Sequence, residues 1–338
     1  MSGAAAGLGP PVPGEVTAEL TELASGVYAY LQSPGGWCLS NAGVLLDADG
    51  AVVIDTLATE RRARALRAAV DRVSSGPRRL LVNTHHHGDH TFGNHLFGPQ
   101  AQIVAHELAV GELAATGLAL THLWSEVDWG DVRVTPPTIT FGDRLTLWPG
   151  GRRVELLHVG PAHTTNDVVV WPPDERVLFA GDVALSGCAP FVLMGSVAGT
   201  LRAIEELRRL EPATVVCGHG PPTGSEVLDT NAAYLRWVQE IAVQGDAAGW
   251  TPLETASRLG RSAFGELLDA ERVVGNLHRA FAELPRDREL GHRDQELGHR
   301  AQGPGHRDRG PGHPEPDVLA AFAEMVTYNG GRLPTCLA

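Results

Sequence analysis

The sequence contains no lysine, so all 27 of its strongly basic residues are arginines. A protein without lysine cannot form a Schiff base with a carbonyl substrate through an ε-amine, and this class of covalent catalysis is excluded. Basic residues are also fewer than acidic ones, 27 against 40, which gives a formal net charge of −13 at pH 7. The phosphate backbone repels such a chain, and we therefore predict no nucleic-acid partner.

Cysteine is scarce as well, with four residues scattered along the chain at Cys38, Cys188, Cys217 and Cys336. They form neither a CxxC pair nor a dense disulfide framework, a pattern typical of a reducing compartment. No apolar run reaches the roughly 18–20 residues that a membrane-spanning helix needs. Residues 1–15 lack the basic start and apolar segment of a secretion signal. We predict a cytoplasmic protein without a membrane partner, with a flexible tail over residues 1–15.

What the chain does contain is an alternation of strand-like and helix-like segments. Alternating or continuous apolar residues predict strands, and apolar residues three and four apart predict helices. Strands are predicted at 26–32, 78–85, 101–107, 144–148, 153–159, 167–173, 176–182 and 213–220, and residues 41–56 are predicted to form two strands joined by a D-A-D-G turn. Helices are predicted at 59–73, 111–124 and 200–210, and a loop at 134–140. Because strands bracket helices throughout, the pattern predicts a layered α/β fold.

The last third of the chain has a different composition. Residues 225–284 have a helical pattern, and one more helix is predicted at Val318–Tyr328. Between them a seven-residue unit is repeated from residue 289 to 316, and the glycine in each unit excludes a coiled coil. We predict a core over 16–224, a helical extension over 225–284, a disordered linker over 285–316, and a C-terminal helix and tail over 317–338 that pack on the core.

The most informative stretch is LLVNTHHHGDHTFGNHL, residues 80–96. Here a predicted strand runs into His85, His87, Asp89 and His90. Residues i and i+2 of an extended segment point to the same side, so His85 and His87 can reach one ion. The glycine that follows lets the chain turn, and Asp89 and His90 then face a second position. Imidazole and carboxylate groups are ligands that divalent zinc accepts.

Three further candidate ligands follow later predicted strands. His163 lies in the loop after the strand at 153–159, Asp182 ends the strand RVLFAGD, and His219 lies at the end of the strand ATVVCGHG. Open α/β sheets place functional groups at strand ends, so these three side chains can complete the ligand set. A carboxylate at Asp182 can bridge two cations and offset their repulsion. Cys217 is predicted to be a buried thiol rather than a ligand.

In this order, HxHxDH, a loop histidine, an aspartate in AGD and a histidine in GHG resemble the motifs of the metallo-β-lactamase superfamily. The resemblance covers about residues 26–220 and implies an αβ/βα sandwich, here with a C-terminal helical extension, that holds two Zn²⁺ ions. Asp55 matches a motif whose aspartate supports the metal-binding loop without contacting the ions. The implied ligands are His85, His87 and His163 for one ion, Asp89, His90 and His219 for the other, and Asp182 between them.

Other segments resemble the second-ring cyclases of aromatic (type II) polyketide pathways, of the actinorhodin type. They include GGWCLSNAGV, VDWGD, GPAHTTNDVVVW, FAGDVALSG and YNGGRLPTCLA, and the resemblance covers most of residues 26–284 and 317–338. It implies an intramolecular aldol condensation and dehydration of an aromatic polyketide bound to acyl carrier protein, with thioester cleavage as a further step that the same site could perform. Asp89 or zinc-bound hydroxide would remove the α-proton, and Asp182 is the second candidate catalytic residue.

A polyketide substrate calls for an aromatic and apolar pocket. Its candidate residues lie in loops beside the metal motifs, with ordinary packing as an equally weighted alternative: Trp37, Trp124, Trp129, Phe191 and Met194. Arg61, Arg64 and Arg67 could meet an acidic carrier protein, although a solvated helix face is favoured. The oligomeric state is left open, with a dimer as one option.

Two other functions remain open. One is a simple two-zinc hydrolase of a small thioester, lactone or β-lactam, which the metal motifs alone would favour. The other is a binding module that keeps the fold without catalysis. The complete ligand set argues against the binding module, because such a protein would be free to lose ligands.

Overall fold

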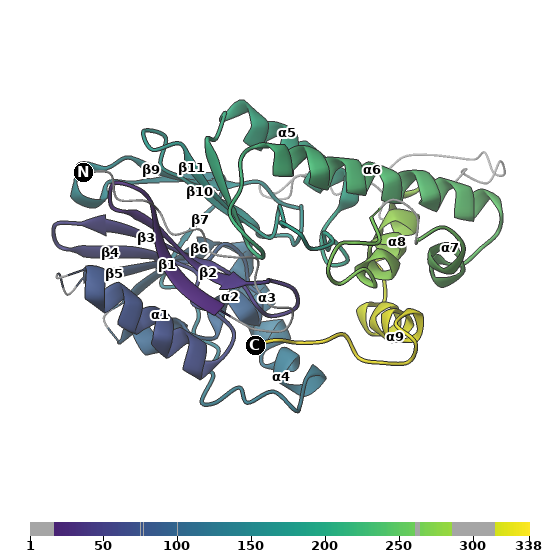
Figure 1. Ribbon diagram of the computed structural model, residues 1–338, viewed down its shortest axis with the longest axis horizontal. Helices are drawn as coiled ribbons and strands as arrows, with labels where there is room; N and C mark the ends of the chain where they lie inside the picture. Colours follow the sequence, from purple (N-terminus) through teal and green to yellow (C-terminus); the bar gives the residue numbers. More distant parts are fainter. Residues whose placement is uncertain (1–16, 75, 77, 100, 261–263, 286–314) are drawn as a thin grey trace, which may run out of the picture.

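The computed structural model describes residues 17–74, 76, 78–99, 101–260, 264–285 and 315–338. Two β-sheets lie face to face, and helices cover the outer side of each (Figure 1). The α/β sandwich predicted from the sequence is therefore confirmed. The tail predicted over 1–15 and nearly all of the linker predicted over 285–316 fall outside the described residues.

The first sheet has seven strands whose order follows the sequence. They are β1 (Thr17–Ala24), β2 (Val27–Ser33), β3 (Ala42–Asp47), β4 (Gly50–Ile54), β5 (Arg78–Val82), β6 (Gln102–His106) and β7 (Ile139–Phe141). β1 to β4 form an antiparallel meander, whereas β4 to β7 are parallel. The carboxyl ends of β4, β5 and β6 therefore meet at one edge of the sheet.

The second sheet has five strands in the order β12-β11-β10-β9-β8. They are β8 (Arg144–Leu147), β9 (Val154–His158), β10 (Val168–Trp171), β11 (Val177–Gly181) and β12 (Thr214–Cys217). Only β11 and β12 are parallel neighbours, and the other pairs are antiparallel. As a result β9, β11 and β12 run in the same direction, and their carboxyl ends also share one edge.

The helices of the sandwich are α1 (Glu60–Val73), α2 (Gly88–Thr91), α3 (Leu108–Thr116), α4 (Ala119–Leu123) and α5 (Val197–Arg209), with short 3₁₀ turns at Asn94–Phe97 and Pro149–Gly151. α1 begins where the Thr59 side chain accepts a hydrogen bond from Arg62 N. Its apolar stripe, which includes Leu66 and Val70, packs on the first sheet. α5 packs on the second sheet in the same way, for example through Ile204.

The innermost core lies between the two sheets. Inward-facing valines from both contribute to it, such as Val52 of β4 and Val170 of β10. Full burial of one such side chain stabilises the fold by about 1.5–3 kcal/mol. The inner strands are buried on both faces, so β4 and β10 are apolar at every position except the first residue of β4, which is glycine. This explains why continuous apolar runs, and not only alternating ones, predicted the strands.

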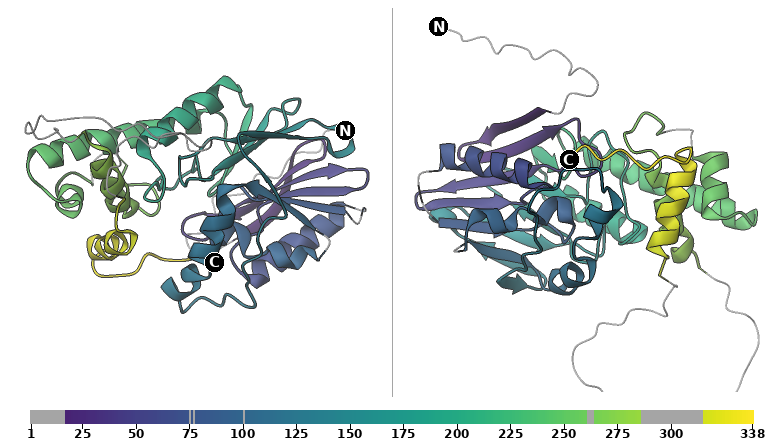
Figure 2. Two further views of the ribbon diagram at one scale, coloured as in Figure 1. Left: turned by 180° about the vertical axis from the view of Figure 1, so that it is seen from behind. Right: turned by 90° about the horizontal axis from the view of Figure 1, so that it is seen from below.

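Four helices follow the sandwich: α6 (Glu226–Ala247), α7 (Pro252–Leu259), α8 (Arg272–Glu283) and α9 (Val318–Tyr328). α6 packs on α5 and α8, and α9 packs on α8. From α9 the chain returns to the sandwich, as both views in Figure 2 show. There Trp124 Nε1 donates to Pro334 O at 2.7 Å, and Arg62 Nη2 donates to Leu337 O at 2.6 Å.

Two strands differ from the sequence-based expectation. β1 was not predicted as a strand, because it is an edge strand with largely exposed side chains and only a weak apolar pattern. β7 begins inside the stretch 134–140, which was predicted to be a loop. Backbone pairing places it there, since Thr138 N donates to Ile103 O at 2.8 Å and β7 pairs with β6 at the edge of the sheet. Neither strand has the continuous apolar core of β4 or β10.

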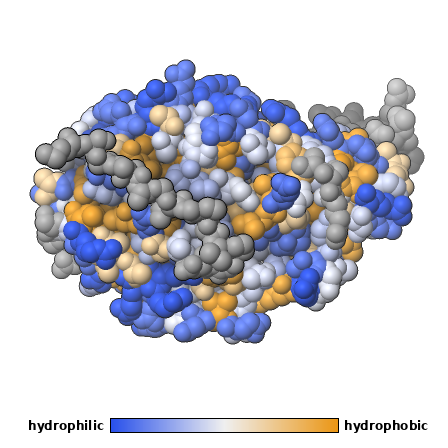
Figure 3. All heavy atoms as spheres, in the orientation of Figure 1, coloured by the Kyte–Doolittle hydropathy of each residue, from blue (hydrophilic) through white to orange (hydrophobic). Residues whose placement is uncertain are grey.

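Hydrophilic side chains cover much of the face drawn in Figure 3, and apolar ones lie between them in separate patches. Exposed large apolar residues occur on different elements, for example Trp148 after β8 and Leu319 on α9. Within the described part of the chain, no helix combines the length and the apolar character that crossing a membrane requires.

His106, at the end of β6, is a buried histidine that stacks on His158 of β9, with 3.6 Å between the ring centroids and 12° between the planes. Its Nδ1 accepts a hydrogen bond from Leu108 N at 3.3 Å. Burial, and then the nearby His158, lower the pKa of His106 to about 4, although Asp143 acts in the opposite direction. The folded protein therefore keeps His106 neutral in mildly acidic solution, where an unfolded chain takes up a proton.

We expect this histidine to make folding stability depend on pH. Because the pKa of His106 is lower in the folded state, the unfolded state binds more protons between about pH 6.5 and 4, and the free energy of unfolding falls as the pH falls through that window. His106→Phe keeps a ring in the stack but removes the titration. When the pH is lowered from about 7.5 to 5, the free energy of unfolding of the wild type should fall by about 1–2 kcal/mol more than that of His106→Phe. Urea denaturation at both pH values measures this shift, and an unchanged difference would contradict the prediction.

Candidate metal centre

Histidine and aspartate side chains gather at one rim of the sandwich, where strands of both sheets end. From the first sheet, β5 leads into residues 83–90, which carry four of the predicted ligands. The segments after β9, β11 and β12 of the second sheet supply the other three, His163, Asp182 and His219. A backbone hydrogen bond from Val168 N to Thr84 O, 2.7 Å long, joins the two sheets at this rim. The fold thus brings all seven predicted ligands together.

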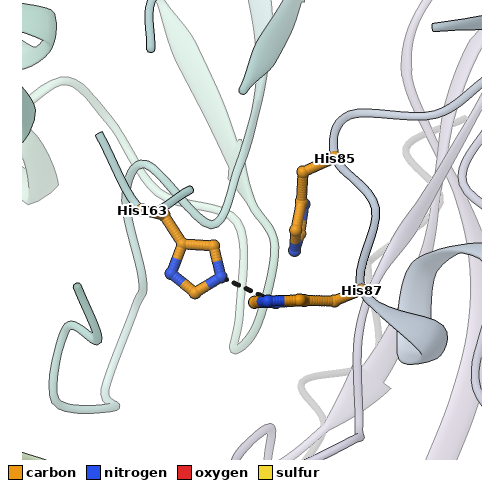
Figure 4. Close-up of side chains that lie close together, drawn as sticks. All are labelled: His85, His87 and His163. Atoms are coloured by element: carbon orange, nitrogen blue, oxygen red, sulfur yellow. Dashed lines mark hydrogen bonds between the residues drawn. The ribbon is translucent and has the colours of Figure 1, made fainter. Parts of the chain in front are cut away.

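His85, His87 and His163 form the first group, with one ring nitrogen of each within 4.8 Å of the others. Figure 4 shows the rings pointing toward one another from two loops, and His163 Nε2 lies 3.0 Å from His87 Nδ1. Contacts on the far side orient two of the rings: His85 Nδ1 lies 3.1 Å from the Thr84 hydroxyl, and His163 Nδ1 contacts Phe191 O. If these Nδ1 atoms carry the protons, the Nε2 atoms of His85 and His163 turn lone pairs toward the centre.

Asp89, His90 and His219 form the second group, again with ligand atoms within 4.8 Å of one another. Asp89 Oδ2 lies 3.4 Å from His219 Nε2 and 3.7 Å from His90 Nε2. His90 is held from behind, because its Nδ1 lies 2.8 Å from Asp55 Oδ2. Once His90 loses its second proton and keeps only the one on Nδ1, its Nε2 would also turn a lone pair toward the centre.

Asp182 lies between the two groups. Its Oδ2 is 3.6 Å from His163 Nε2 and 3.3 Å from His219 Nε2, and its Oδ1 is 3.3 Å from His90 Nε2. One carboxylate therefore contacts histidines of both groups, which is the position that a bridging ligand requires. The approach depends on Gly218, since a Cβ atom there would lie 1.8 Å from Asp182 Oδ1.

Asp55 directly follows β4 in a left-handed backbone conformation, with φ of 60°. Its Oδ1 accepts a hydrogen bond from Thr84 N at 2.8 Å, and its Oδ2 accepts one from the Thr84 hydroxyl at 2.7 Å. Because that hydroxyl donates to Asp55, it can only accept from His85 Nδ1. One buried carboxylate thus orients His90 directly and His85 through a hydroxyl. This is the supporting position that the sequence resemblance implied for Asp55.

Burial and neighbouring charges divide the histidines into two kinds. Burial, followed by the adjacent imidazoles, lowers the pKa of His85 and His87 well below the ordinary value, so both are neutral. Burial also disfavours charge on His90 and His219, but Asp182 raises the pKa of both, that of His219 to about 9. The second group therefore holds protons where a cation would otherwise balance the carboxylates. Metal binding would release those protons.

The donor set fits a divalent metal. Five buried atoms of these seven side chains make no hydrogen bond to any residue that the structure describes: His85 Nε2, His87 Nε2, His90 Nε2, Asp182 Oδ1 and His219 Nδ1. An unsatisfied buried polar atom costs roughly 1–3 kcal/mol, and a bound cation would offset that cost. Neutral imidazole and carboxylate are ligand types of zinc in proteins. These groups could therefore hold metal ions.

A cavity of about 660 Å³ opens directly onto this centre. Five of the seven predicted ligands lie on its wall: His87, Asp89, His163, Asp182 and His219. The remaining wall is mostly apolar, with several aromatic rings. Pockets for drug-sized ligands measure roughly 300–1,000 Å³, so the cavity has room for a substrate of that size.

The structure places four of the five predicted pocket residues on the cavity wall: Trp37, Trp124, Phe191 and Met194. Trp37 lies at the centre of an aromatic cluster, with its ring centroid 5.6 Å from that of Trp124 and 5.1 Å from that of Phe191. Trp129 is not a wall residue, so the prediction was wrong for this tryptophan. Its indole donates to Trp124 O at 2.9 Å, and its ring centroid lies 6.2 Å from that of Phe92, so it packs in the core and does not line the cavity.

Sequence reasoning missed the part of the wall that the C-terminal helices supply. α9 contributes Leu319 and Phe322, and α8 contributes Arg272. The Phe322 ring lies 6.0 Å from both Trp37 and Trp124, although about 200 or more residues separate these positions in the chain. The available signal was Arg272 itself, because an arginine in the first turn of a predicted helix opposes the helix dipole.

The three arginines considered for carrier docking lie on the exposed face of α1. Arg64 pairs with Glu60 at 2.7 Å and Arg67 with Asp71 at 3.7 Å, as i,i+4 neighbours on a solvated helix commonly do. No observation here ties Arg61 or its neighbours to a partner, so docking stays a prediction.

Two residues beside the motifs, His86 and Cys217, belong to neither ligand group. His86 turns to Asn166, with 2.9 Å between His86 Nδ1 and Asn166 Nδ2. Cys217 is buried, and burial raises the pKa of its thiol. Both are packing residues.

Comparison with known proteins gives a family match. The sequence model of the Metallo-beta-lactamase superfamily matches residues 35–219, more than half of the chain. Among curated proteins, the linear primary-alkylsulfatase of a Pseudomonas strain is 27% identical over 136 residues, 36% of this chain and 25% of the sulfatase. The chain thus spans about a quarter of the length of this relative.

Solved structures give the same fold. A metallo-beta-lactamase from Pontibacter korlensis superposes with a TM-score of 0.53 at 22% identity, over 65% of this chain and 99% of that protein. The DIM-1 metallo-beta-lactamase superposes with the same TM-score at 21% identity, over 66% of this chain and 99% of its own. At these identities the likeness concerns the fold.

Proposed function

This chain belongs to the metallo-beta-lactamase superfamily, and from that premise we propose that it is a zinc-dependent cyclase of aromatic polyketide biosynthesis. Members of the superfamily are typically metal-dependent hydrolases, so a metal-dependent enzyme is the general expectation. The proposed reaction closes the second ring of a polyketide held on acyl carrier protein. One carbon–carbon bond forms between an enolate carbon and a ketone carbon, the ketone oxygen takes a proton, and water leaves as the ring becomes aromatic.

The observation that carries the proposal is the cavity beside the candidate metal centre. A hydrolase of small polar substrates has no need of a largely apolar cavity of about 660 Å³. A partly cyclised polyketide is large, planar and conjugated, and the rings of Trp37, Trp124 and Phe191 can stack on such a skeleton. Holding a flexible chain in one folded shape would decide which carbon attacks which ketone.

In this proposal the two groups of side chains hold two zinc ions, with Asp182 between them. The first ion would lie among His85, His87 and His163, and the second among Asp89, His90 and His219. Zinc held there would supply Lewis-acid stabilisation of negative charge on a carbonyl oxygen. Asp55 would hold the His90 ring in place directly and the His85 ring through the Thr84 hydroxyl, because its buried carboxylate makes hydrogen bonds with both oxygens.

Two carboxylates of the ligand groups line the cavity, Asp89 and Asp182. Asp89 is the proposed base, because it contacts histidines of the second group only. Burial raises the pKa of this carboxyl, but His90 and His219 together keep it well below its usual range. A weak base removes only acidic protons, and the methylene between two carbonyl groups carries such protons. Asp182, with both oxygens directed at histidines, would fix the two cations and take no proton.

The second candidate function is hydrolysis of an ester-type bond on an apolar chain. The superfamily's typical activity favours it, and so does the partial match to a protein named linear primary-alkylsulfatase. The same cavity would hold the chain, and a water molecule would replace the enolate as nucleophile. Hydrolysis of the carrier thioester after cyclisation would combine both functions in one site.

Incubating the zinc-loaded protein with a carrier-bound polyketide that already carries its first ring tests the proposal. We expect a bicyclic aromatic product with one water fewer than the substrate, detected by mass spectrometry. Asp89→Asn should lower its formation by roughly 10²-fold or more, as loss of a positioned base does. Asp131→Asn, an exposed carboxylate paired with Arg133, is the matched control and should leave the rate unchanged.

Other products decide between the alternatives. If only the uncyclised acid accumulates, the protein is a thioester hydrolase and the cyclase proposal fails. If neither product forms and carefully purified protein carries less than about one zinc per chain, the binding-module alternative is favoured.

A further inference from the structure

Arg272, the first residue of α8, is only 3% exposed and yet lies on the wall of the cavity. A guanidinium taken out of water is costly unless its charge is paired. Its place in the first turn of a helix adds repulsion from the helix dipole. Among the described residues that line the cavity, it is the one arginine.

Contacts on one side hold the guanidinium rigidly. Nη1 donates to Ala189 O at 2.9 Å, and Nη2 lies 3.0 Å from Asp269 Oδ2. The Trp37 ring covers one face, with its centroid 4.2 Å from the Arg272 Cζ. Trp37 is fixed in turn, because its Nε1 donates to Glu271 Oε1 at 2.7 Å. The planar group therefore has one orientation.

These contacts leave the donors of Arg272 incompletely used. A guanidinium has five N–H groups, and Nε makes no hydrogen bond within the described part of the chain. The Asp269 contact is not a well-aligned hydrogen bond either, since Asp269 Oδ2 is likewise without a hydrogen bond there. Nε is itself shielded from solvent, so an acceptor in the cavity would use a remaining N–H group of Nη1 or Nη2.

We propose that Arg272 binds an anionic oxygen, an enolate or a carboxylate, of a planar conjugated substrate in the cavity. The inference rests on the proposed function only in taking this cavity as the substrate site. A charged donor in a dry apolar wall binds an anionic oxygen more strongly than one in water, and a guanidinium fixes its direction. Trp37 and Phe191 would contact the rings of the same molecule. The wall would thus select aromatic acids over neutral aromatic compounds of equal size.

Binding of inert ligands tests this without any turnover. Naphthylacetate and naphthylacetamide have the same rings and nearly the same shape but differ in charge. Quenching of tryptophan fluorescence reports their binding, because Trp37 and Trp124 line the cavity. The wild-type protein should bind the acid roughly 10-fold more tightly than the amide. An acylated indanedione, whose enol is ionised at neutral pH, tests the enolate.

Arg272→Gln should reduce the acid-to-amide ratio to about one while the affinity for the amide changes little. Arg279→Gln is the matched control, because Arg279 is also buried on α8 and donates to a backbone carbonyl, Leu193 O, without lining the cavity. The lower acid-to-amide ratio of Arg272→Gln should also be seen after zinc is removed with a chelator. This control distinguishes binding of the acid to the arginine from binding of the acid to metal.

An unchanged ratio in Arg272→Gln would overturn the proposal, and so would an equal loss of both ligands, which indicates a purely structural arginine. Failure of the wild-type protein to bind either ligand would overturn it as well. If Arg272→Gln does not fold, Arg272→Lys should still lower the ratio relative to Arg279→Lys, because a point charge replaces the planar fork. Cyclase activity can fail or succeed independently of these results. If the indanedione shows no dependence on Arg272, the recognised group is a carboxylate.

Discussion

If the centre holds two zinc ions as proposed, replacing Asp182 with alanine is expected to lower the zinc content to one ion per chain or fewer and to slow the proposed cyclisation by roughly 10³-fold. Its two oxygens contact His163 of the first group and both His90 and His219 of the second, at 3.3–3.6 Å. No other carboxylate among the described residues reaches histidines of both groups within an ion-pair distance. Without it, two cations would face each other with one anionic ligand fewer.

Metal analysis of purified protein and initial rates at saturating zinc measure this effect. Asp182→Asn is expected to fall between the wild type and Asp182→Ala, because an amide keeps the size but carries no charge. His106→Phe changes a buried histidine outside both groups and should retain both ions. If Asp182→Ala kept two ions and the wild-type rate, Asp182 would not hold the metals together.

Asp55→Ala is expected to weaken zinc binding by roughly 10–100-fold, although Asp55 belongs to neither ligand group. The carboxylate accepts from Thr84 N, the Thr84 hydroxyl and His90 Nδ1. Its loss frees the ring of His90 to rotate, and that of His85 through the hydroxyl. It also leaves buried donors unpaired, which should lower the free energy of unfolding by about 1–3 kcal/mol.

Thr84→Val is the matched control for this prediction. It removes the hydroxyl beside His85 but leaves the contact between Asp55 and His90 in place, so the loss of zinc affinity should be smaller. Competition with a chromogenic chelator measures affinity, and urea denaturation of the metal-free protein measures stability. Equal affinities for the wild type and Asp55→Ala would show that packing alone orients the histidines.

Local pattern was sufficient to predict the rim of the sandwich. His85 and His87 are two apart in one extended segment, and the later ligands each follow an apolar run that had to be a buried strand. Backbone direction then decides the rest, because β9, β11 and β12 run in the same direction and end at one edge. These ligands can be found from the sequence because the apolar run that predicts each strand lies within a few residues of the ligand itself.

The cavity wall could not be predicted in the same way. Arg272 and Trp37 are in contact across more than 230 residues of chain, and no local pattern of either residue encodes the other. Trp129 was wrongly predicted as a wall residue, since it lies close in sequence to Trp124 and yet does not line the cavity. Aromatic residues near a motif indicate a cluster, but the direction of each ring depends on turns that composition does not specify.

The candidate metal centre and the outer cavity wall come from separate parts of the chain. Every predicted ligand lies between residues 85 and 219, whereas Leu319 and Phe322 of the wall lie on α9. The return of the chain to the sandwich includes two hydrogen bonds from side chains, to Pro334 O and Leu337 O. Substitutions on α9 can therefore reshape the cavity while the reactive centre stays intact. In the course of evolution, one reactive centre can in this way act on differently shaped molecules through changes in a single helix.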